Sequence, residues 1–147
     1  MARMDFGLVA QHVGFQIHLT WRAIKKKMLV SGKRAEGRVS RGSYSIPILI
    51  GLNPGITPQE LANALHLDAS KIAFLLRELE ADALVTRTPS LEDKRKVELH
   101  LTDKGQALAQ QATLSAAAIE EPIASVITMQ ERTELIRILT KIQDAMS

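Results

Sequence analysis

Hydrophobic side chains recur with helical spacing along most of this 147-residue chain. The segment from Phe6 to Leu29 carries them on one broad face, which predicts a first amphipathic helix. Ser45 to Leu52 is almost entirely apolar and stops before Asn53-Pro54-Gly55, so it predicts a short buried helix. The polar, glycine-rich stretch 31–43 predicts a linker between these two helices.

Two further helices are predicted next, separated by a short turn at His66-Leu67-Asp68. The first begins with the capping box Thr57-Pro58-Gln59-Glu60 and runs to about Leu65, and Asp68 caps the second. The apolar residues of the second helix share one face and must point inward: Ile72, Leu75, Leu76 and Leu79. The same spacing exposes Ser70, Lys71, Ala73, Phe74 and Arg77. Such a pair lets the second helix enter the major groove of DNA by its N-terminal end.

A β-hairpin with a charged tip is predicted after these helices. Leu84 to Thr88 supplies one strand, Pro89 and Ser90 begin the turn, and Val97, Leu99 and Leu101 alternate with polar residues in the other strand. The tip is too charged for a core, since it contains Glu92, Asp93, Lys94, Arg95 and Lys96. A hairpin of this kind after an amphipathic helix is typical of a wing, which presses cations against the nucleic-acid backbone and minor groove. The pattern therefore predicts DNA binding.

Two helices are predicted for the C-terminal part. Thr102 is placed to cap a long alanine-rich helix, which we expect to be disturbed at Glu120-Glu121-Pro122. The capping box Thr128-Met129-Gln130-Glu131 opens the last helix. One face of that helix is apolar: Leu135, Ile138, Leu139 and Ile142.

The ordered motifs of the central part resemble the MarR family of winged helix-turn-helix regulators. The resemblance rests on Asn53-Pro54-Gly55-Ile56-Thr57, Glu60-Leu61-Ala62, Leu79-Glu80, Leu84-Val85-x-Arg87, Asp93-x-Arg95 and Val97-x-Leu99-x-Leu101-Thr102-x-x-Gly105. It implies a mostly α fold with a small β-hairpin wing and with N- and C-terminal dimerisation helices. The whole chain, 1–147, is then a single MarR-like domain. Its DNA-binding part spans about 44–101, and its dimerisation helices span about 6–29 and 102–147.

The predicted DNA contacts come from the second helix and the wing. Ser70 and Lys71 can reach base edges or phosphates, and Arg77 can reach a phosphate or guanine. Phe74 replaces the polar residue usual in the family, and two interpretations stay open: contact with a thymine methyl group, or packing against the wing or a neighbouring helix. Arg95 resembles the family's minor-groove arginine, and Lys94 and Lys96 add attraction to phosphates.

One residue departs from the family pattern at the end of that second helix. Ala83 stands where the family commonly has glycine as a helix terminator. An alanine with positive φ costs about 1 kcal/mol. We therefore expect this helix to end differently here.

Composition narrows the class of protein. The net charge of +3 is unevenly placed, with the basic excess before residue 102 and a slightly acidic remainder. The absence of cysteine excludes disulfides and thiolate chemistry. No apolar run approaches the roughly 20 residues of a membrane span, and the N-terminus has no signal-peptide pattern, so a cytoplasmic location without membrane association is expected. His66 and His100 have no second ligand at metal spacing, so neither a metal nor a cofactor is predicted.

The flanking helices carry more apolar surface than a small winged domain can cover. In the family such helices interleave with those of a second subunit, which implies a homodimer on a pseudo-palindromic double-stranded operator with half-sites about one helical turn (roughly 34–36 Å) apart. The alternative is packing within a monomer.

The basic stretch from Arg22 to Arg41 allows three interpretations: a solvated linker, extra contacts with the DNA backbone, or a grip on an anionic effector. The third draws on a resemblance of Arg41-Gly42-Ser43-Tyr44 and the following isoleucines to the MarR subgroup that regulates aromatic-acid breakdown, some of which respond to acyl-CoA thioesters. The residues assigned to this effector are His18, Trp21, Arg22, Lys33, Arg34, Arg38, Arg41, Tyr44 and Ile48. His18 and Trp21 also suit a core or a dimer contact.

We therefore expect a ligand-responsive, sequence-specific regulator. The predicted role is a repressor of an aromatic-compound catabolic operon, released by an aromatic acid or its acyl-CoA thioester. The alternative is a ligand-indifferent architectural or nucleoid protein, which would share the DNA-binding parts. An enzyme is disfavoured, because no nucleophile and base stand in a known motif and no glycine-rich phosphate loop is present.

Overall fold

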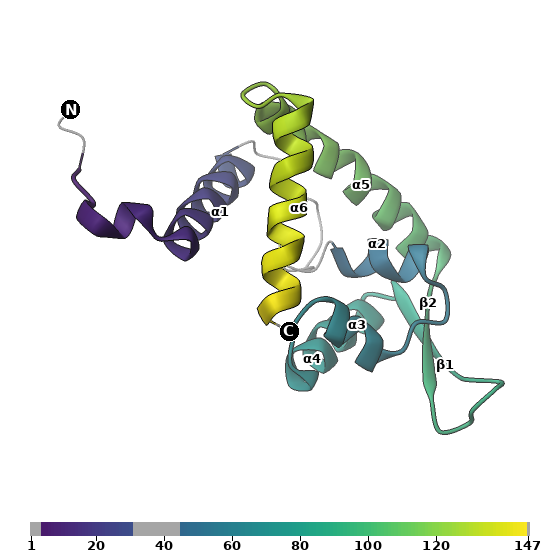
Figure 1. Ribbon diagram of the computed structural model, residues 1–147. Coiled ribbons are helices and arrows are strands. Elements are labelled where there is room, and N and C mark those ends of the chain that lie inside the picture. Colours follow the sequence, from purple (N-terminus) through teal and green to yellow (C-terminus); the bar gives the residue numbers. More distant parts are fainter. Residues whose placement is uncertain (1–3, 31–44, 147) are drawn as a thin grey trace. The chain divides into compact units, whose positions relative to one another are not determined.

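The computed structural model describes residues 4–30 and 45–146, which belong to two compact units. Residues 4–30 lie in the first unit and residues 45–146 in the second. The winged helix-turn-helix predicted from the sequence is confirmed in the second unit (Figure 1). No helix in the described part of the chain is long and apolar enough to cross a membrane.

The first unit contains a short 3-10 helix and one α-helix, not the single helix predicted from Phe6 to Leu29. The 3-10 helix η1 spans Gly7–Gln11 and α1 spans Val13–Val30, with extended backbone at His12 between them. Gly7 has φ +52°, and its N–H donates to the Asp5 carboxylate. The Gln16 side-chain amide donates to the Ala10 carbonyl, which a continuous helix would have bonded to a backbone N–H. At the break, the Gln16 side chain thus replaces a backbone hydrogen bond of a continuous helix.

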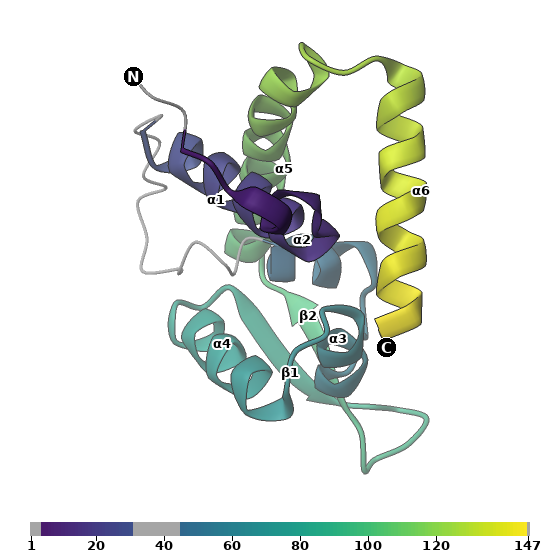
Figure 2. The same ribbon diagram turned by 60° about the vertical axis from the view of Figure 1, so that its left-hand side comes forward.

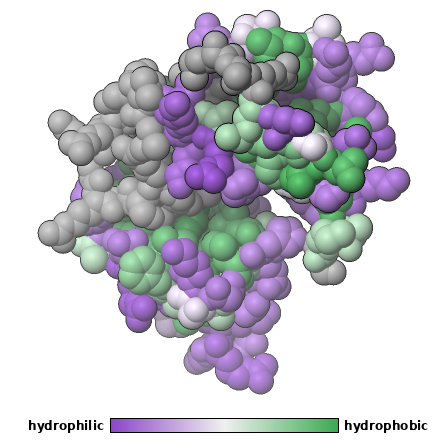
Figure 3. All heavy atoms as spheres, turned by 90° about the vertical axis from the view of Figure 1, so that its left-hand side faces the viewer, coloured by the Kyte–Doolittle hydropathy of each residue, from purple (hydrophilic) through white to green (hydrophobic). Residues whose placement is uncertain are grey.

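The first unit exposes a hydrophobic face. Figure 3 looks onto the side where η1 and α1 lie and shows a hydrophobic patch bordered by hydrophilic side chains. The exposed large hydrophobic residues of this unit include Leu8, Val9, Val13, Ile17 and Trp21.

The second unit contains the other helices and the hairpin. In chain order these are α2 (Ser45–Leu52), α3 (Pro58–Ala64), α4 (Ala69–Ala81), β1 (Val85–Pro89), β2 (Val97–Leu101), α5 (Asp103–Ala124) and α6 (Met129–Met146). The strands are antiparallel and pair Val85 with Leu101 and Pro89 with Val97. Pro89 therefore ends β1 and does not begin the turn, a position that proline tolerates because the end of an edge strand needs no N–H donor. The hairpin extends away from the helices in both ribbon views (Figures 1 and 2).

The core is formed by side chains of α2, α3, α4 and the hairpin, with Leu84 just before β1. Its members are Ile46, Ile50, Leu61, Ala62, Ile72, Leu75, Leu76, Leu79, Leu84, Val85 and Leu99. The predicted inward face of α4 is confirmed, since all four of its apolar residues are buried. α2 packs against α5 and β2, so the core is in contact with the first of the two long C-terminal helices.

The helix starts predicted from capping residues are confirmed. Thr57 and Glu60 form a reciprocal capping box at α3, and Thr128 and Glu131 do the same before α6. In each box the backbone N–H of the threonine lowers the pKa of the glutamate, and the threonine hydroxyl adds to that effect. Thr102 caps α5, where its hydroxyl oxygen accepts the Gly105 N–H.

The expectation that α4 would end differently because of Ala83 is wrong. Ala83 has φ +55° and terminates the helix as a glycine would. Its N–H donates to the Glu80 carbonyl at 2.9 Å, and the Leu84 N–H donates to the Leu79 carbonyl at 2.8 Å. These two bonds form a Schellman motif, and the hydrophobic pair that usually accompanies it, Leu79 and Leu84, is buried. Burial of this pair offsets the backbone strain at the alanine.

The expected disturbance of α5 at Pro122 is also absent. The helix continues past Pro122 to Ala124, although proline has no N–H to donate to the carbonyl four residues earlier. Ser125 satisfies the carbonyls there, because its N–H donates to Glu121 and its hydroxyl to Pro122.

The strained end of α4 yields a stability prediction. Ala83→Gly should raise the free energy of unfolding by about 0.5–1 kcal/mol, because glycine adopts the left-handed region without the penalty paid by alanine. Denaturant unfolding measures the change. The matched control is Ala107→Gly on the exposed side of α5, which should lower stability by about 1 kcal/mol. A loss of stability in both variants would contradict the strain at Ala83.

Candidate nucleic-acid interface

The N-terminal end of α4 is fixed by Asp68. The Asp68 carboxylate accepts the Lys71 N–H at 2.7 Å and the Ser70 hydroxyl at 2.5 Å. The Ser70 hydroxyl and then the Lys71 backbone N–H lower the pKa of Asp68. The side chains of Ser70 and Lys71 are exposed at this end. Arg77, about two helical turns further along, is also exposed. The residues predicted to read DNA from α4 thus share its exposed surface.

Phe74 lies on the same exposed surface and not in the core. Its side chain is 46% exposed, and the Lys71 ammonium sits 5.5 Å from the centroid of its ring. A cation over an aromatic face is attracted by the ring quadrupole. The contact keeps the lysine beside the ring and leaves the ring accessible to a partner.

The turn before α4 is short because α3 also ends in a Schellman motif. His66 has φ +50°, its N–H donates to Asn63, and the Leu67 N–H donates to Ala62. Histidine is among the residues that tolerate this region better than most. Asp68 follows at once as the cap of α4, so only residues 65–68 connect the two helices.

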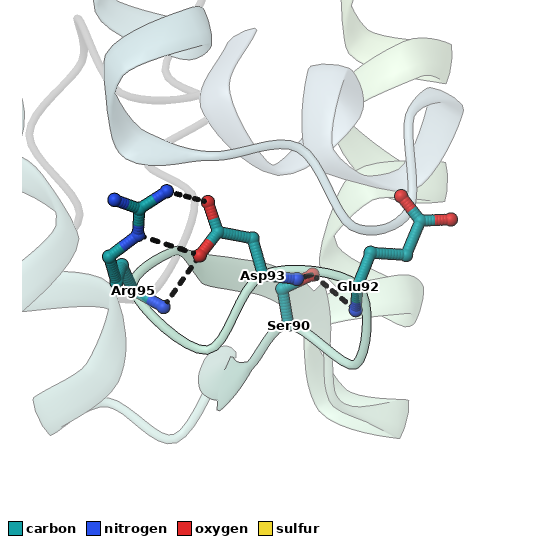
Figure 4. A network of polar contacts seen from close by, with 4 residues as sticks. All are labelled: Ser90, Glu92, Asp93 and Arg95. Carbon is teal, nitrogen blue, oxygen red and sulfur yellow. Dashed lines mark hydrogen bonds and ion pairs between the residues drawn. The ribbon is translucent and has the colours of Figure 1, made fainter.

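The wing is a hairpin whose turn is held by its own polar groups. The buried Ser90 hydroxyl oxygen accepts the N–H groups of Glu92 and Asp93, at 3.3 and 3.4 Å (Figure 4). Two backbone bonds close the turn: Ser90 N–H to the Lys96 carbonyl, and Lys96 N–H to the Asp93 carbonyl. Lys94 and Lys96 also lie in this turn, and both are exposed to solvent.

Asp93 holds Arg95 in a forked contact. Its carboxylate accepts the Arg95 backbone N–H, the Nε at 3.1 Å and an Nη at 3.2 Å (Figure 4). The guanidinium, and next the backbone N–H, lowers the pKa of Asp93. The Arg95 side chain nevertheless stays 91% exposed, so the arginine is oriented without being covered. Through these bonds Asp93 holds the turn and orients the arginine.

An ion pair between Glu80 and Arg87 joins α4 to the wing. The two residues belong to the motifs quoted from the sequence, but no role was predicted for either. Arg87 donates its Nε to the Glu80 carboxylate, which links the last turn of α4 to β1. The sequence shows an acidic residue late in a helix and a basic residue early in the next strand. Only the fold brings the two together, so this signal is weak.

The residues assigned to an effector are divided. His18, Trp21 and Arg22 lie on one face of α1 and, together with Ala23, Lys25 and Lys26, line an open hollow of about 650 Å³. A single helix supplies only one wall of a binding site. Ile48 is half-buried in α2, in the other unit. Lys33, Arg34, Arg38, Arg41 and Tyr44 lie outside the described residues. Within the described ranges, no group of three or more histidine or acidic side chains could hold a metal ion.

Comparison with known proteins places these features in a family. The MarR family model matches residues 39–97. A putative transcriptional regulatory protein for the hcr operon of Thauera aromatica is 30% identical over 97% of this chain and 85% of its own length. The chain belongs to the MarR family.

Solved structures agree with this assignment. The MarR fold of this chain superposes on the transcriptional repressor CouR, bound to a 23-mer DNA duplex, with a TM-score of 0.82 and 25% identity. That match covers 97% of this chain and 99% of CouR. BpsR of Bordetella bronchiseptica, whose DNA binding is regulated by 6-hydroxynicotinic acid, has the same fold at 17% identity, with a TM-score of 0.81 over 97% of this chain and 99% of its own. The chain is a DNA-binding transcriptional regulator of the MarR type.

The exposure of Phe74 yields a prediction about specificity. Phe74→Ala should reduce discrimination between operator and unrelated DNA more than it reduces non-specific affinity, because an apolar ring cannot bind phosphate. The slope of log affinity against log salt should stay nearly unchanged. Lys71→Ala is the matched control on the same surface, and it should flatten that slope. A large drop in melting temperature in Phe74→Ala with intact discrimination would instead make the ring a packing residue.

Proposed function

We propose that this protein is a ligand-responsive, sequence-specific repressor that acts as a homodimer in the cytoplasm. The observation that carries the proposal is the exposed face of α4 beside a wing whose Arg95 is oriented and uncovered. In this proposal Ser70, Lys71, Phe74 and Arg77 contact the major groove. Lys94, Arg95 and Lys96 contact the flanking minor groove and backbone. The likeness to CouR bound to DNA supports the assignment.

The homodimer forms through the N- and C-terminal helices. Within the protomer, α6 leaves hydrophobic residues in water, with Leu135 46% and Ile138 41% exposed. An apolar helix face of this kind needs a covering partner, and a second copy with the same face supplies one. Two copies would then meet a pseudo-palindromic operator with half-sites roughly 34–36 Å apart.

A charge placed on this face of α6 should separate the protomers. Leu135→Lys should give monomers with poor operator affinity, because each large aliphatic side chain buried contributes about 1.5–3 kcal/mol. Sedimentation velocity at micromolar concentration measures the change. Thr140→Lys, on the opposite face of the same helix, should leave the dimer intact. A monomeric unmodified protein would overturn the assembly.

The proposed effector is an aromatic acid or its acyl-CoA thioester. His18, Trp21 and Arg22 offer an aromatic wall with hydrogen-bonding and cationic groups, and Ile48 and Tyr44 would meet the hydrophobic part. Lys33, Arg34, Arg38 and Arg41 would grip the phosphates. The regulation of BpsR by 6-hydroxynicotinic acid shows this class of ligand on the same fold. The protein releases DNA only if the effector binds more tightly to a dimer in which the spacing of the two α4 helices fits the operator poorly.

Footprinting with and without a ligand tests the proposal. We expect one protected pseudo-palindrome upstream of a regulated operon, and loss of protection with benzoate or benzoyl-CoA. The double variant Arg38→Ala/Arg41→Ala should keep the footprint and lose the response to benzoyl-CoA. Loss of the footprint with a flatter salt slope would mean that these arginines grip the DNA backbone. Diffuse protection by the unmodified protein would favour an architectural role.

A further inference from the structure

The tip of the wing presents a fully exposed leucine. Leu91 is 99% exposed, more than any other large hydrophobic side chain in the described part of the chain. Scattered hydrophobic residues are common on protein surfaces, so exposure alone carries no meaning. Its position does carry meaning, because Leu91 directly precedes the charged run of the tip and lies between the two strands of the hairpin, which extends away from the helices (Figures 1 and 2).

The wing does not need the Leu91 side chain for its own structure. The turn is closed around the buried Ser90, whose hydroxyl and backbone bind Glu92, Asp93 and Lys96. Asp93 then fixes Arg95. Leu91 sits on the outside of this hydrogen-bonded turn, so its backbone is held while its side chain contacts water. The turn therefore presents an apolar group in a defined place.

The charges around Leu91 indicate what covers it. The tip carries Lys94, Arg95 and Lys96 against Glu92 and Asp93, a net charge of +1, and the Arg95 side chain stays 91% exposed although Asp93 binds it. This excess of positive charge favours a polyanion over a second copy of the same tip. The minor groove of DNA has phosphates along its rims, apolar deoxyribose on its walls and the edges of the bases on its floor. Proteins that bind there often insert an apolar side chain between base steps beside a cation.

We propose that Leu91 is a further specificity-determining residue, an apolar wedge that enters the minor groove beside Arg95. The inference rests on the proposed DNA-binding function and adds a mode of recognition to it. A wedge partly unstacks the step that it enters, so it favours pyrimidine–purine steps, which open easily, over stiff A-tracts. Specificity for the outer part of each half-site then comes from deformability and not from hydrogen bonds to bases.

Selection of bound sequences from a randomised DNA duplex pool tests the wedge and does not require a known operator. The unmodified protein should enrich TA or CA steps at a fixed distance outside each half-site. Leu91→Ser should lose that enrichment while keeping the inner half-site sequence, and should bind the selected duplex roughly ten times more weakly with an unchanged salt slope. Leu91→Met, which keeps a long apolar side chain, should retain both the enrichment of these steps and the affinity of the unmodified protein.

Two controls distinguish a wedge from a purely electrostatic contact of the wing. Leu91→Lys should steepen the salt slope without restoring the flanking preference, because a cation attracts phosphates but does not unstack bases. Energy transfer between dyes at the duplex ends should report less bending with Leu91→Ser than with the unmodified protein. Equal bending and equal enrichment in Leu91→Ser would overturn the inference. Absence of any enriched sequence with the unmodified protein would instead overturn sequence-specific binding itself.

Discussion

The backbone of Leu84 joins the three parts that would face DNA or a partner subunit. Its N–H ends α4 by bonding the Leu79 carbonyl, and its carbonyl accepts the Thr102 N–H at the start of α5. A Cβ on Gly105 would lie only 2.0 Å from the Leu84 oxygen, so no residue but glycine allows α5 to approach this closely. The side chain of Leu84 is buried in the core. The helix α4, the wing and α5 therefore share one anchoring point.

Residues whose effect is local could be read from the sequence. The capping boxes at Thr57 and Thr128, the Asp68 cap and the inward face of α4 each depend on neighbours within one or two helical turns. The errors arose where a local rule met a competing interaction. Burial of Leu79 against Leu84 made a left-handed Ala83 acceptable. The last helical turn of α5 continues past Pro122, and the Gln16 side chain binds the Ala10 carbonyl where the predicted first helix is divided.

The candidate site could be predicted as a set of residues but not as an arrangement. The sequence placed Asp93 and Arg95 in one turn, and two residues of separation suffice to explain their contact. The link from Glu80 to Arg87 needs the end of α4 to fold back toward β1, which no local spacing indicates. Exposure of Leu91 is likewise invisible in a pattern, because a leucine usually signals a core. The residues assigned to an effector are spread over both units and the segment between, so periodicity in the sequence cannot predict their mutual geometry.

The ion pair between Glu80 and Arg87 has a consequence for how an operator can vary. It adds a side-chain link to the backbone junction at Leu84, so α4 and the base of the wing are joined at two places within a protomer. In the proposed complex, the number of base pairs between the major-groove contact and the flanking minor-groove contact is then set by the protein. Each half-site has a fixed internal length. Natural operators can diverge in base identity at many positions, whereas insertion or deletion of a single base pair inside a half-site separates the two contacts.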